Sequence, residues 1–231
     1  KEDLEAKGHK FTTKSDTEVL LHGYEEYKED LLPMLRGMFA FVIYDTKTKE
    51  LFGARDFYGI KPLYYYKQDK EFMFGSETKS FLAHPNFKKE LNRDMLEDYL
   101  TFQYSVGEDT FFKNVYKLRP GHYFKYKDGN LTIKEYYSIK FEPDTKKTEE
   151  EWKKEIKELL EDSVKAHKVS DVEVGSFLSS GVDSSYIATV SDVDKTFTVG
   201  WDNKKYSEID YAKDLTNKLN IKNISEKIVE K

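Results

Sequence analysis

The run VEVGSFLSSGVDSSYIATV, residues 172–190, decides the fold of the last third of the chain. It is apolar as far as Leu178, which predicts a buried strand at 172–178, and after a polar interruption it becomes apolar again too soon to form another strand. We therefore expect a helix there, followed by a second strand in KTFTVGW, residues 195–201. A further helix at 207–220 and a possible third strand at 224–229 continue the pattern. The order strand, loop, helix, strand predicts an α/β domain with a parallel sheet.

The polar interruption, residues 179–185, holds four serines, one glycine and one aspartate. The amino end of a helix presents free amides and the positive end of the helix dipole, so this loop is predicted to bind an anion such as phosphate. Gly181 would let the backbone approach the ligand without a Cβ, and the Asp183 carboxylate is an oxygen ligand suited to Mg²⁺. The hydroxyl donors of the loop are Ser179, Ser180 and Ser184.

The same loop has a simpler interpretation, in which serine and aspartate only cap the helix that follows. For an isolated motif of this kind, capping is the commoner role. Two other chemistries are excluded by spacing, because the chain has neither GxxxxGK[ST], the Walker-type phosphate loop, nor GxSxG, the serine nucleophile elbow.

The first part of the chain predicts an α+β domain. Ser15 and Glu18 have the spacing of a capping box, which predicts a helix beginning there, with Ser15 accepting from the amide of Glu18. Four aromatic and β-branched runs between residues 38 and 78 predict an antiparallel meander. Asn92 is expected to cap a second helix, and the pair beginning at Asp128, Asp-Gly, predicts a hairpin turn.

Residues 141–150 are polar and contain a proline, which predicts a linker, placed at 138–148. Thr148 and Glu151 repeat the capping-box spacing at the start of an amphipathic helix. The predicted organisation is therefore a first domain at 1–137, the linker at 138–148 and a second domain at 149–231.

Composition limits the possible functions. The 231 residues include 38 basic and 43 acidic side chains, a net charge of −5, so no basic field predicts a nucleic-acid partner and small molecules are the expected partners. There is no cysteine, which excludes disulfides and thiolate chemistry within these residues. No apolar run approaches the length of a membrane span, so we expect no membrane partner and a cytoplasmic location. The chain begins on Lys1 and ends as an apolar pattern restarts, which predicts a piece of a longer protein.

The five histidines show no spacing typical of metal ligands, so the sequence predicts no transition-metal site. Magnesium bound with a nucleotide is the only metal expected. The histidines are His9, His22, His84, His122 and His167.

Longer motifs carry a resemblance to a known family. LSSGVDSS, residues 178–185, resembles the SGGxDS pyrophosphate loop of ATP pyrophosphatases. SDTEVLLHGYEEY, LRGMFAFVIYD and ARDFYGIKPLYYY resemble the later half of a glutamine amidotransferase domain of the amino-terminal-nucleophile class. The order of the two domains is similar to that of glutamine-hydrolysing asparagine synthetases, over essentially the whole chain. The resemblance implies an incomplete αββα fold like that of amino-terminal-nucleophile hydrolases, followed by an incomplete Rossmann-like adenine nucleotide α-hydrolase fold.

The resemblance also implies a reaction. In that family glutamine is hydrolysed by an amino-terminal cysteine, and the ammonia amidates aspartate that ATP and Mg²⁺ have activated as β-aspartyl-AMP. No catalytic residue is assigned here, because the chain has no cysteine. Asp16 matches the aspartate that binds the α-amino group of glutamine, although a first-turn acid also stabilises a helix dipole. The residues that match ATP-binding positions are Leu178, Ser179, Ser180, Gly181, Asp183, Ser184 and Val199, with Asp183 also the metal ligand.

Some positions and alternatives stay open. Ser180 replaces the family's usual first glycine, so its Cβ could narrow the phosphate cradle while its hydroxyl adds a donor. Arg55 and Asp56 are expected to bond across to other elements in a structural role. Trp201, Asp202 and Tyr206 are expected to lie on the surface or in packing. The whole protein could instead be another adenylating amidotransferase, such as a β-lactam-synthetase-like or carboxylate-amidating enzyme, or the chain could be a catalytically inactive nucleotide-binding fragment. A homodimer of the full-length protein is also possible.

Overall fold

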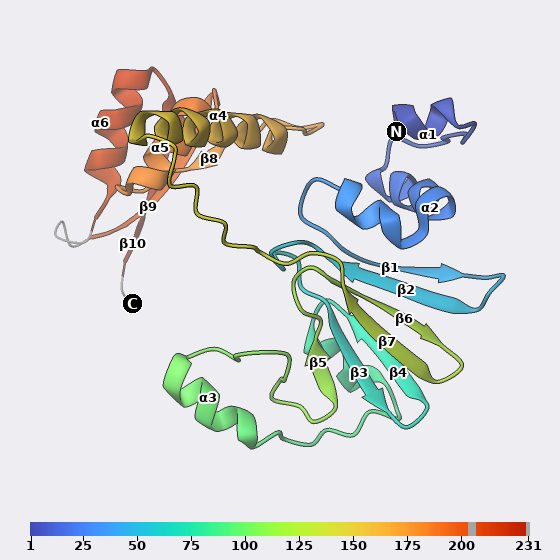
Figure 1. The fold of residues 1–231 in the computed structure, drawn as a ribbon. Helices are drawn as coiled ribbons and strands as arrows, with labels where there is room; N and C mark the ends of the chain where they lie inside the picture. Colours follow the sequence, from blue (N-terminus) through green and yellow to red (C-terminus); the bar gives the residue numbers. More distant parts are fainter. Residues whose placement is uncertain (203–206, 230–231) are drawn as a thin grey trace. The chain divides into compact units, whose positions relative to one another are not determined.

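The computed structural model describes residues 1–202 and 207–229. The chain divides into two compact units, Lys1–Phe141 and Glu142–Lys231, and each is described by itself (Figure 1). Within the described residues, no helix is both long enough and apolar enough to cross a membrane.

The first unit contains two antiparallel sheets. The larger sheet has the order β1-β2-β6-β7, and the smaller one has the order β4-β3-β5. The strands of the larger sheet are β1 (Ala40–Asp45), β2 (Glu50–Arg55), β6 (His122–Lys127) and β7 (Asn130–Glu135). Those of the smaller sheet are β3 (Tyr64–Gln68), β4 (Glu71–Gly75) and β5 (Val115–Lys117).

The single meander predicted at 38–78 is wrong in one respect. The four runs form two antiparallel hairpins, β1-β2 and β3-β4, but the hairpins belong to different sheets. The second edge of β2 pairs with β6, whose residues follow more than sixty positions later, so β3 cannot occupy that edge. The β6-β7 hairpin turns at Asp128 and Gly129, both with positive φ, as the Asp-Gly pair predicts.

Arg55 and Asp56 hold the loop that leads away from β2. The Arg55 guanidinium donates to the carbonyls of Gly59 at 2.6 Å and Lys61 at 2.7 Å, and also to that of Leu118 at 2.6 Å. The Asp56 carboxylate, only 1% exposed, accepts from three backbone amides of the same loop. The expected bond across to another segment is confirmed for Arg55, which reaches Leu118, whereas the Asp56 carboxylate bonds within its own loop.

A helical layer covers one face of the larger sheet. It consists of α2 (Asp16–Tyr27) and the 3₁₀ helix η1 (Lys28–Met34), and α1 (Glu2–Ala6) packs against α2. Tyr24 of α2 stacks on Phe52 of β2 with ring centroids 4.6 Å apart. Side chains alternate between faces along a strand, so Tyr123 of β6 joins this cluster, whereas Phe124 lies in a separate core with residues of β3.

The start of α2 differs from the predicted capping box. Ser15 is the N-cap, but its side chain accepts from the amide of Thr17 at 3.2 Å rather than from that of Glu18. Glu18 instead accepts from the amides of Thr12 and Thr13, at 2.7 and 2.6 Å, and from both of their hydroxyls. The adjacent threonines offer four donors, which outcompete the single amide of Ser15. The side-chain bond from Thr13 and then the backbone bond from Thr12 lower the pKa of Glu18 to about 2.

The remaining helices of the first unit are η2 (Thr78–Ala83) and α3 (Asp94–Phe102). Asn92 does not cap α3, because the N-cap is Arg93 and no side chain caps that end. The backbone of Asn92 is committed elsewhere, since its amide donates to the carbonyl of Phe111 at 2.9 Å.

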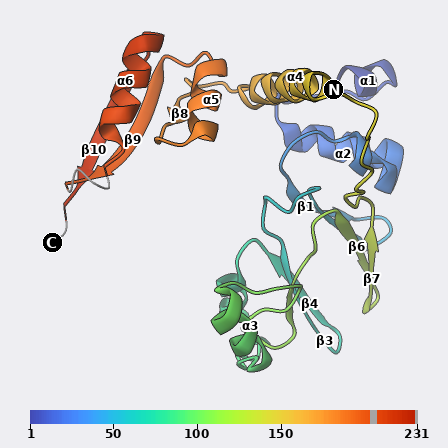
Figure 2. The same cartoon turned by 60° about the vertical axis from the view of Figure 1, so that its left-hand side comes forward.

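The second unit is a parallel three-stranded sheet with the order β10-β9-β8, flanked by helices (Figure 2). The predicted parallel pairing of the second-domain strands is confirmed. The elements are α4 (Glu149–His167), β8 (Ser176–Phe177), α5 (Val182–Val190), β9 (Lys195–Trp201), α6 (Ile209–Leu219) and β10 (Lys222–Ile228).

The predicted strand 172–178 is much shorter in the structure, because only Ser176–Phe177 is assigned to β8. The strand is at the edge of the sheet and pairs only with β9, and one further bond from the amide of Leu178 to the carbonyl of Phe197 extends the pairing. Val172 is 76% exposed, so the beginning of the predicted strand lacks the burial that its apolar pattern led us to expect.

The long helix α4 begins as the sequence predicts. Thr148 accepts from the amide of Glu151 at 3.3 Å, and the Glu151 carboxylate accepts from the amide of Thr148 at 2.8 Å. No residue of α4 is buried within the unit. The core of the second unit consists instead of Leu178, Ala188 and Ala212, which join the end of β8 to α5 and α6.

Candidate functional site

The serine loop connects the end of β8 to the first turn of α5. Leu178, the residue before the loop, is 3% exposed and packs in the core against Ala188 of α5. Its carbonyl accepts from the hydroxyl of Thr198 on β9 at 2.9 Å. The loop is therefore anchored at the carboxyl end of a parallel strand, which is where open α/β sheets bind their ligands.

Two of the predicted donors hold the loop together. The hydroxyls of Ser179 and Ser184 lie 2.7 Å apart, and the Ser184 hydroxyl also accepts from the amide of Ser179 at 3.2 Å. The Ser179 hydroxyl accepts from the amide of Gly181 at 3.2 Å. Ser179, Gly181 and Ser184 thus form one compact turn, in which hydroxyls already satisfy backbone amides.

Gly181 is the N-cap of α5, with an ordinary φ of −71°. Its lack of a side chain matters for space, because a Cβ would lie 3.3 Å from the Ser179 hydroxyl oxygen, a tighter contact than most Cβ atoms make. A side chain at 181 would therefore press on the turn formed with Ser179.

Ser180 bonds to a carboxylate of the same unit. Its hydroxyl donates to the Glu208 carboxylate at 2.6 Å, and its amide donates to the same oxygen at 3.3 Å. Glu208 is the N-cap residue of α6, which follows the neighbouring strand β9. The resembled family usually has glycine at this position, and the hydroxyl that Ser180 adds is used as a donor. The hydroxyl and the amide of Ser180 converge on one negatively charged oxygen.

Glu208 was not among the residues expected at this loop. A signal was available, because Glu208 lies at the start of the helix predicted at 207–220, which follows a predicted parallel strand. The carboxyl ends of adjacent parallel strands meet at one edge of the sheet, so residues that follow them are brought together.

Asp183 is exposed and is the second residue of α5. Within the described part of the chain its carboxylate makes no hydrogen bond or ion pair, and α5 has no side-chain cap at its amino end. The capping alternative is therefore wrong for Asp183. The carboxylate is free to meet a ligand from solvent.

Val199 lies apart from the loop side chains. Along β9 the residues Thr196, Thr198 and Gly200 are buried, whereas Val199 is 51% exposed. Since side chains alternate along a strand, Val199 is on the face opposite Thr198, the residue that holds Leu178. Its side chain does not join the cluster around Ser179.

The residues at and beyond the end of β9 fit the expected surface or packing role as far as they are described. Trp201 is 46% exposed, and Asp202 lies 3.8 Å from Lys227 in an exposed ion pair. Tyr206 lies outside the described residues.

Asp16 lies in the first unit as the first residue of α2. Its side chain is exposed, and the Ser15 hydroxyl lies 3.5 Å from one carboxylate oxygen. This position is suited both to a ligand amine and to stabilisation of the helix dipole.

Two family models match the chain. The one described as "Glutamine amidotransferase domain" matches residues 1–137, and the one described as "Asparagine synthase" matches residues 155–231. The fold and its matches define the class: an amidotransferase domain joined to a synthase domain. The chain belongs to the asparagine synthetase family.

Curated relatives match most of the chain. "Asparagine synthetase [glutamine-hydrolyzing] 1" of Bacillus subtilis is 43% identical over 99% of this chain, which spans 37% of that relative. "Putative asparagine synthetase [glutamine-hydrolyzing] 2" of Methanocaldococcus jannaschii is 37% identical over 87% of the chain and is covered over 41% of its length. "Amidase chry2" of Gibberella zeae is 35% identical over 78% of the chain and is covered over 27% of its length. The chain therefore spans less than half of each of these relatives.

Proposed function

We propose that the serine loop at residues 179–185 is the pyrophosphate-binding part of an ATP site, within an enzyme that makes asparagine from aspartate, ATP and glutamine. The observation that carries the proposal is the pair of Ser180 donors bonded to the Glu208 carboxylate. A loop whose donors converge on a carboxylate oxygen has the polarity to hold a phosphate oxygen. Its place at the carboxyl end of parallel β8 and the amino end of α5 agrees with this role.

In this proposal the loop residues have distinct roles. Ser179 and Ser184 hold the turn, and Gly181 leaves space for the backbone to approach a phosphate. Ser180 donates to a phosphate oxygen after the Glu208 carboxylate, which occupies its two donors in this structure, moves away. Leu178 and Val199 contact the nucleotide through backbone or apolar groups, as the family resemblance implies. Electrostatic stabilisation by such fixed donors is worth most where negative charge grows as pyrophosphate departs.

Asp183 is the proposed ligand of Mg²⁺. An exposed carboxylate without a protein partner offers the hard oxygen donor that Mg²⁺ prefers, usually together with substrate phosphates and water. The ion would neutralise phosphate charge when bound. The carboxylate of Glu208 is held by Ser180, so Asp183 is the acid of this loop left free for metal.

For the first unit we propose the later part of a glutamine amidotransferase domain, with Asp16 binding the α-amino group of glutamine. The proposed domain boundaries are 1–137 and 149–231, with a linker at 138–148. The proposed folds are the αββα arrangement of amino-terminal-nucleophile hydrolases and the Rossmann-like adenine nucleotide α-hydrolase fold, both incomplete. A homodimer of the longer protein, a cytoplasmic location and the lack of a nucleic-acid partner remain predictions.

A second candidate concerns the acceptor. The Gibberella zeae relative matches 78% of this chain but is named an amidase rather than an asparagine synthetase. The residues present here are thus shared by relatives with different names. The alternative proposal is an enzyme that amidates another carboxylate by the same adenylation chemistry.

The direct test is nucleotide binding by the chain, measured by isothermal titration calorimetry. We expect heat of binding for ATP with Mg²⁺, and for pyrophosphate with Mg²⁺, but much less for ATP with EDTA. Titration with Mg²⁺ and GTP tests the preference for adenine. A chain that is folded by circular dichroism but gives no heat with either ATP or pyrophosphate would contradict a phosphate site in these residues and favour the inactive fragment.

A further inference from the structure

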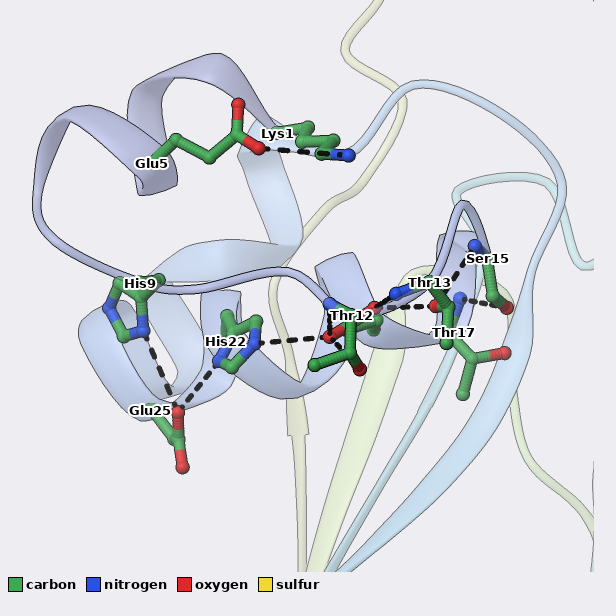
Figure 3. A network of polar contacts seen from close by, with 10 residues as sticks. Lys1, Glu5, His9, Thr12, Thr13, Ser15, Thr17, His22 and Glu25 are labelled. Atoms are coloured by element: carbon green, nitrogen blue, oxygen red, sulfur yellow. Dashed lines mark hydrogen bonds and ion pairs between the residues drawn. The ribbon is translucent and has the colours of Figure 1, made fainter.

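Two histidines and a glutamate of the first unit come together on α2 (Figure 3). His22 and Glu25 are three residues apart on the helix and therefore lie on the same face. His9 reaches the same place from the segment between α1 and α2. One potential ligand atom from each of the three side chains lies within 4.8 Å of the others.

The distances suit a metal ion of small radius. The Glu25 carboxylate oxygen Oε2 lies 3.0 Å from His22 Nδ1 and 3.7 Å from His9 Nδ1. Metal–nitrogen and metal–oxygen bonds of about 2.0–2.2 Å place neighbouring ligands of a tetrahedral site roughly 3.3 Å apart. The two imidazole rings are 4.9 Å apart between centroids, so small side-chain movements bring all three donors to one point.

The other ring nitrogens face further carboxylates. His9 Nε2 lies 3.3 Å from Glu26, and His22 Nε2 lies 3.7 Å from Glu18. Histidines that bind metals commonly donate their second ring N–H to a carboxylate, which fixes the tautomer and orients the ring. Without a metal, His22 Nδ1 hydrogen-bonds to Glu25, and His9 Nδ1 lies on the same side, 3.7 Å from that carboxylate. A bound ion would take the place of the proton on His22 Nδ1.

The outer carboxylates are themselves held in place. Glu18 accepts from the amides of Thr12 and Thr13, and Glu26 accepts from the Lys7 ammonium at 2.5 Å. An isolated histidine–glutamate ion pair would not need a second group to hold its carboxylate in place, as the threonines hold Glu18 and Lys7 holds Glu26. The repetition of the same pattern on both rings distinguishes the cluster from a chance surface contact.

The cluster is accessible to an ion from solvent. The side chains of His9 and His22 are 18% and 21% exposed, and that of Glu25 is 66% exposed. Two imidazoles and one carboxylate would provide three ligands, with a remaining position for water. Imidazole favours zinc and similar divalent transition metals over Mg²⁺ and Ca²⁺.

We propose that His9, His22 and Glu25 form a binding site for a divalent transition metal ion of the Zn²⁺ type, with Glu18 and Glu26 as positioning residues. The site lies within the first unit and is independent of the nucleotide site proposed for the second. The sequence predicted no transition-metal site, because the histidines lack the spacing of metal ligands. In the structure, the turn before α2 brings His9 next to His22, and regular spacing along one segment does not reveal that contact.

The test is titration of the metal-free chain with zinc chloride, in the presence of excess Mg²⁺ and without nucleotide. Calorimetry should give one Zn²⁺ per chain, and Zn²⁺ should raise the melting temperature of the first unit. His9→Gln and His22→Gln should each weaken binding by at least about tenfold, and Glu18→Gln by about 10–100-fold as an outer-shell change. His122→Gln is the matched control, because this histidine is in the same unit but bonds to the Pro120 carbonyl.

Circular dichroism of each variant checks that the fold is retained, which we expect because neither His9 nor His22 is buried. Absence of Zn²⁺ binding by the wild-type chain would overturn the proposal. Equal affinities of the wild-type, His22→Gln and His122→Gln proteins would also overturn it, because the ion would then bind elsewhere. If Glu18→Gln binds Zn²⁺ as tightly as the wild type while the two histidine variants bind it more weakly, Glu18 has no positioning role.

Discussion

Replacing Asp183 with Asn distinguishes a role of this residue in binding nucleotide and Mg²⁺ from a role in the folding stability of the second unit. The carboxylate is exposed and makes no bond within the described chain, and the substitution preserves its size and shape. The only folding contribution lost is the attraction of a first-turn charge to the helix dipole, typically about 0.3–1 kcal/mol. Unfolding of the second unit should therefore change little.

The effect on nucleotide binding should be larger. A hydrogen bond to a charged group is typically worth about 1.5–3 kcal/mol, which corresponds to roughly 10–150-fold in affinity. We expect a loss of this size for ATP with Mg²⁺ in Asp183→Asn. The difference should shrink with ATP in EDTA, because the proposed partner of Asp183 is the metal ion.

Isothermal titration calorimetry at one salt concentration measures the affinities, and denaturation followed by tryptophan fluorescence measures stability. Both tryptophans of the chain lie in the second unit, so their signal reports that unit. Asp94→Asn is the matched control, because it removes an exposed acid from the first turn of α3 in the other unit. Equal dissociation constants for wild-type and Asp183→Asn proteins with Mg²⁺ would refute the assignment of Asp183 to the metal.

Three other predictions concern the first unit. Asp56→Asn should lower the free energy of unfolding of the first unit by about 2–4 kcal/mol, because a buried carboxylate that accepts from three amides loses its charge and one acceptor. Urea denaturation followed by tyrosine circular dichroism measures this change. An unchanged urea midpoint would contradict the structural role of Asp56. The hydrogen bond from Lys125 lowers the pKa of Glu29, so this pair stabilises the fold fully above the ordinary carboxyl pKa of about 4.3 and loses its effect as the pH falls through the lowered value. Lys125→Met should flatten the fall in stability on acidification, and a pH profile parallel to that of the wild type would exclude the pair as its source. Finally, the purified chain should release no ammonia from glutamine, because it has no cysteine to act as the nucleophile; ammonia above a boiled control would contradict this expectation.

Local spacing predicted several elements of the fold correctly. The capping box of Thr148 and Glu151 formed as expected, and so did the Asp128-Gly129 hairpin turn. The alternation of strand and helix patterns after residue 172 predicted parallel pairing. Each of these features depends on residues a few positions apart or on a standard connection, so the amino-acid order carries enough information to determine it.

Competition between nearby groups was harder to predict. The spacing of Ser15 and Glu18 is that of a capping box, yet the donors of Thr12 and Thr13 take the Glu18 carboxylate. Asn92 has a residue type suited to capping, but its backbone bonds to Phe111 and the helix begins later. In both cases the local preference is worth only about 1 kcal/mol, so neighbouring contacts decide the outcome.

The sequence by itself determined the order of helices and strands from α4 to β10, the parallel β8–β9 unit and the position of the serine loop at a helix amino end. Only the tertiary structure decided that β2 pairs with β6 rather than with β3, that Glu208 bonds to Ser180, and that His9 meets His22. The physical reason is that strand pairing and side-chain contacts across a unit depend on how distant segments bury their apolar faces together. That choice is made by the summed packing of the whole unit, and no single residue spacing encodes it.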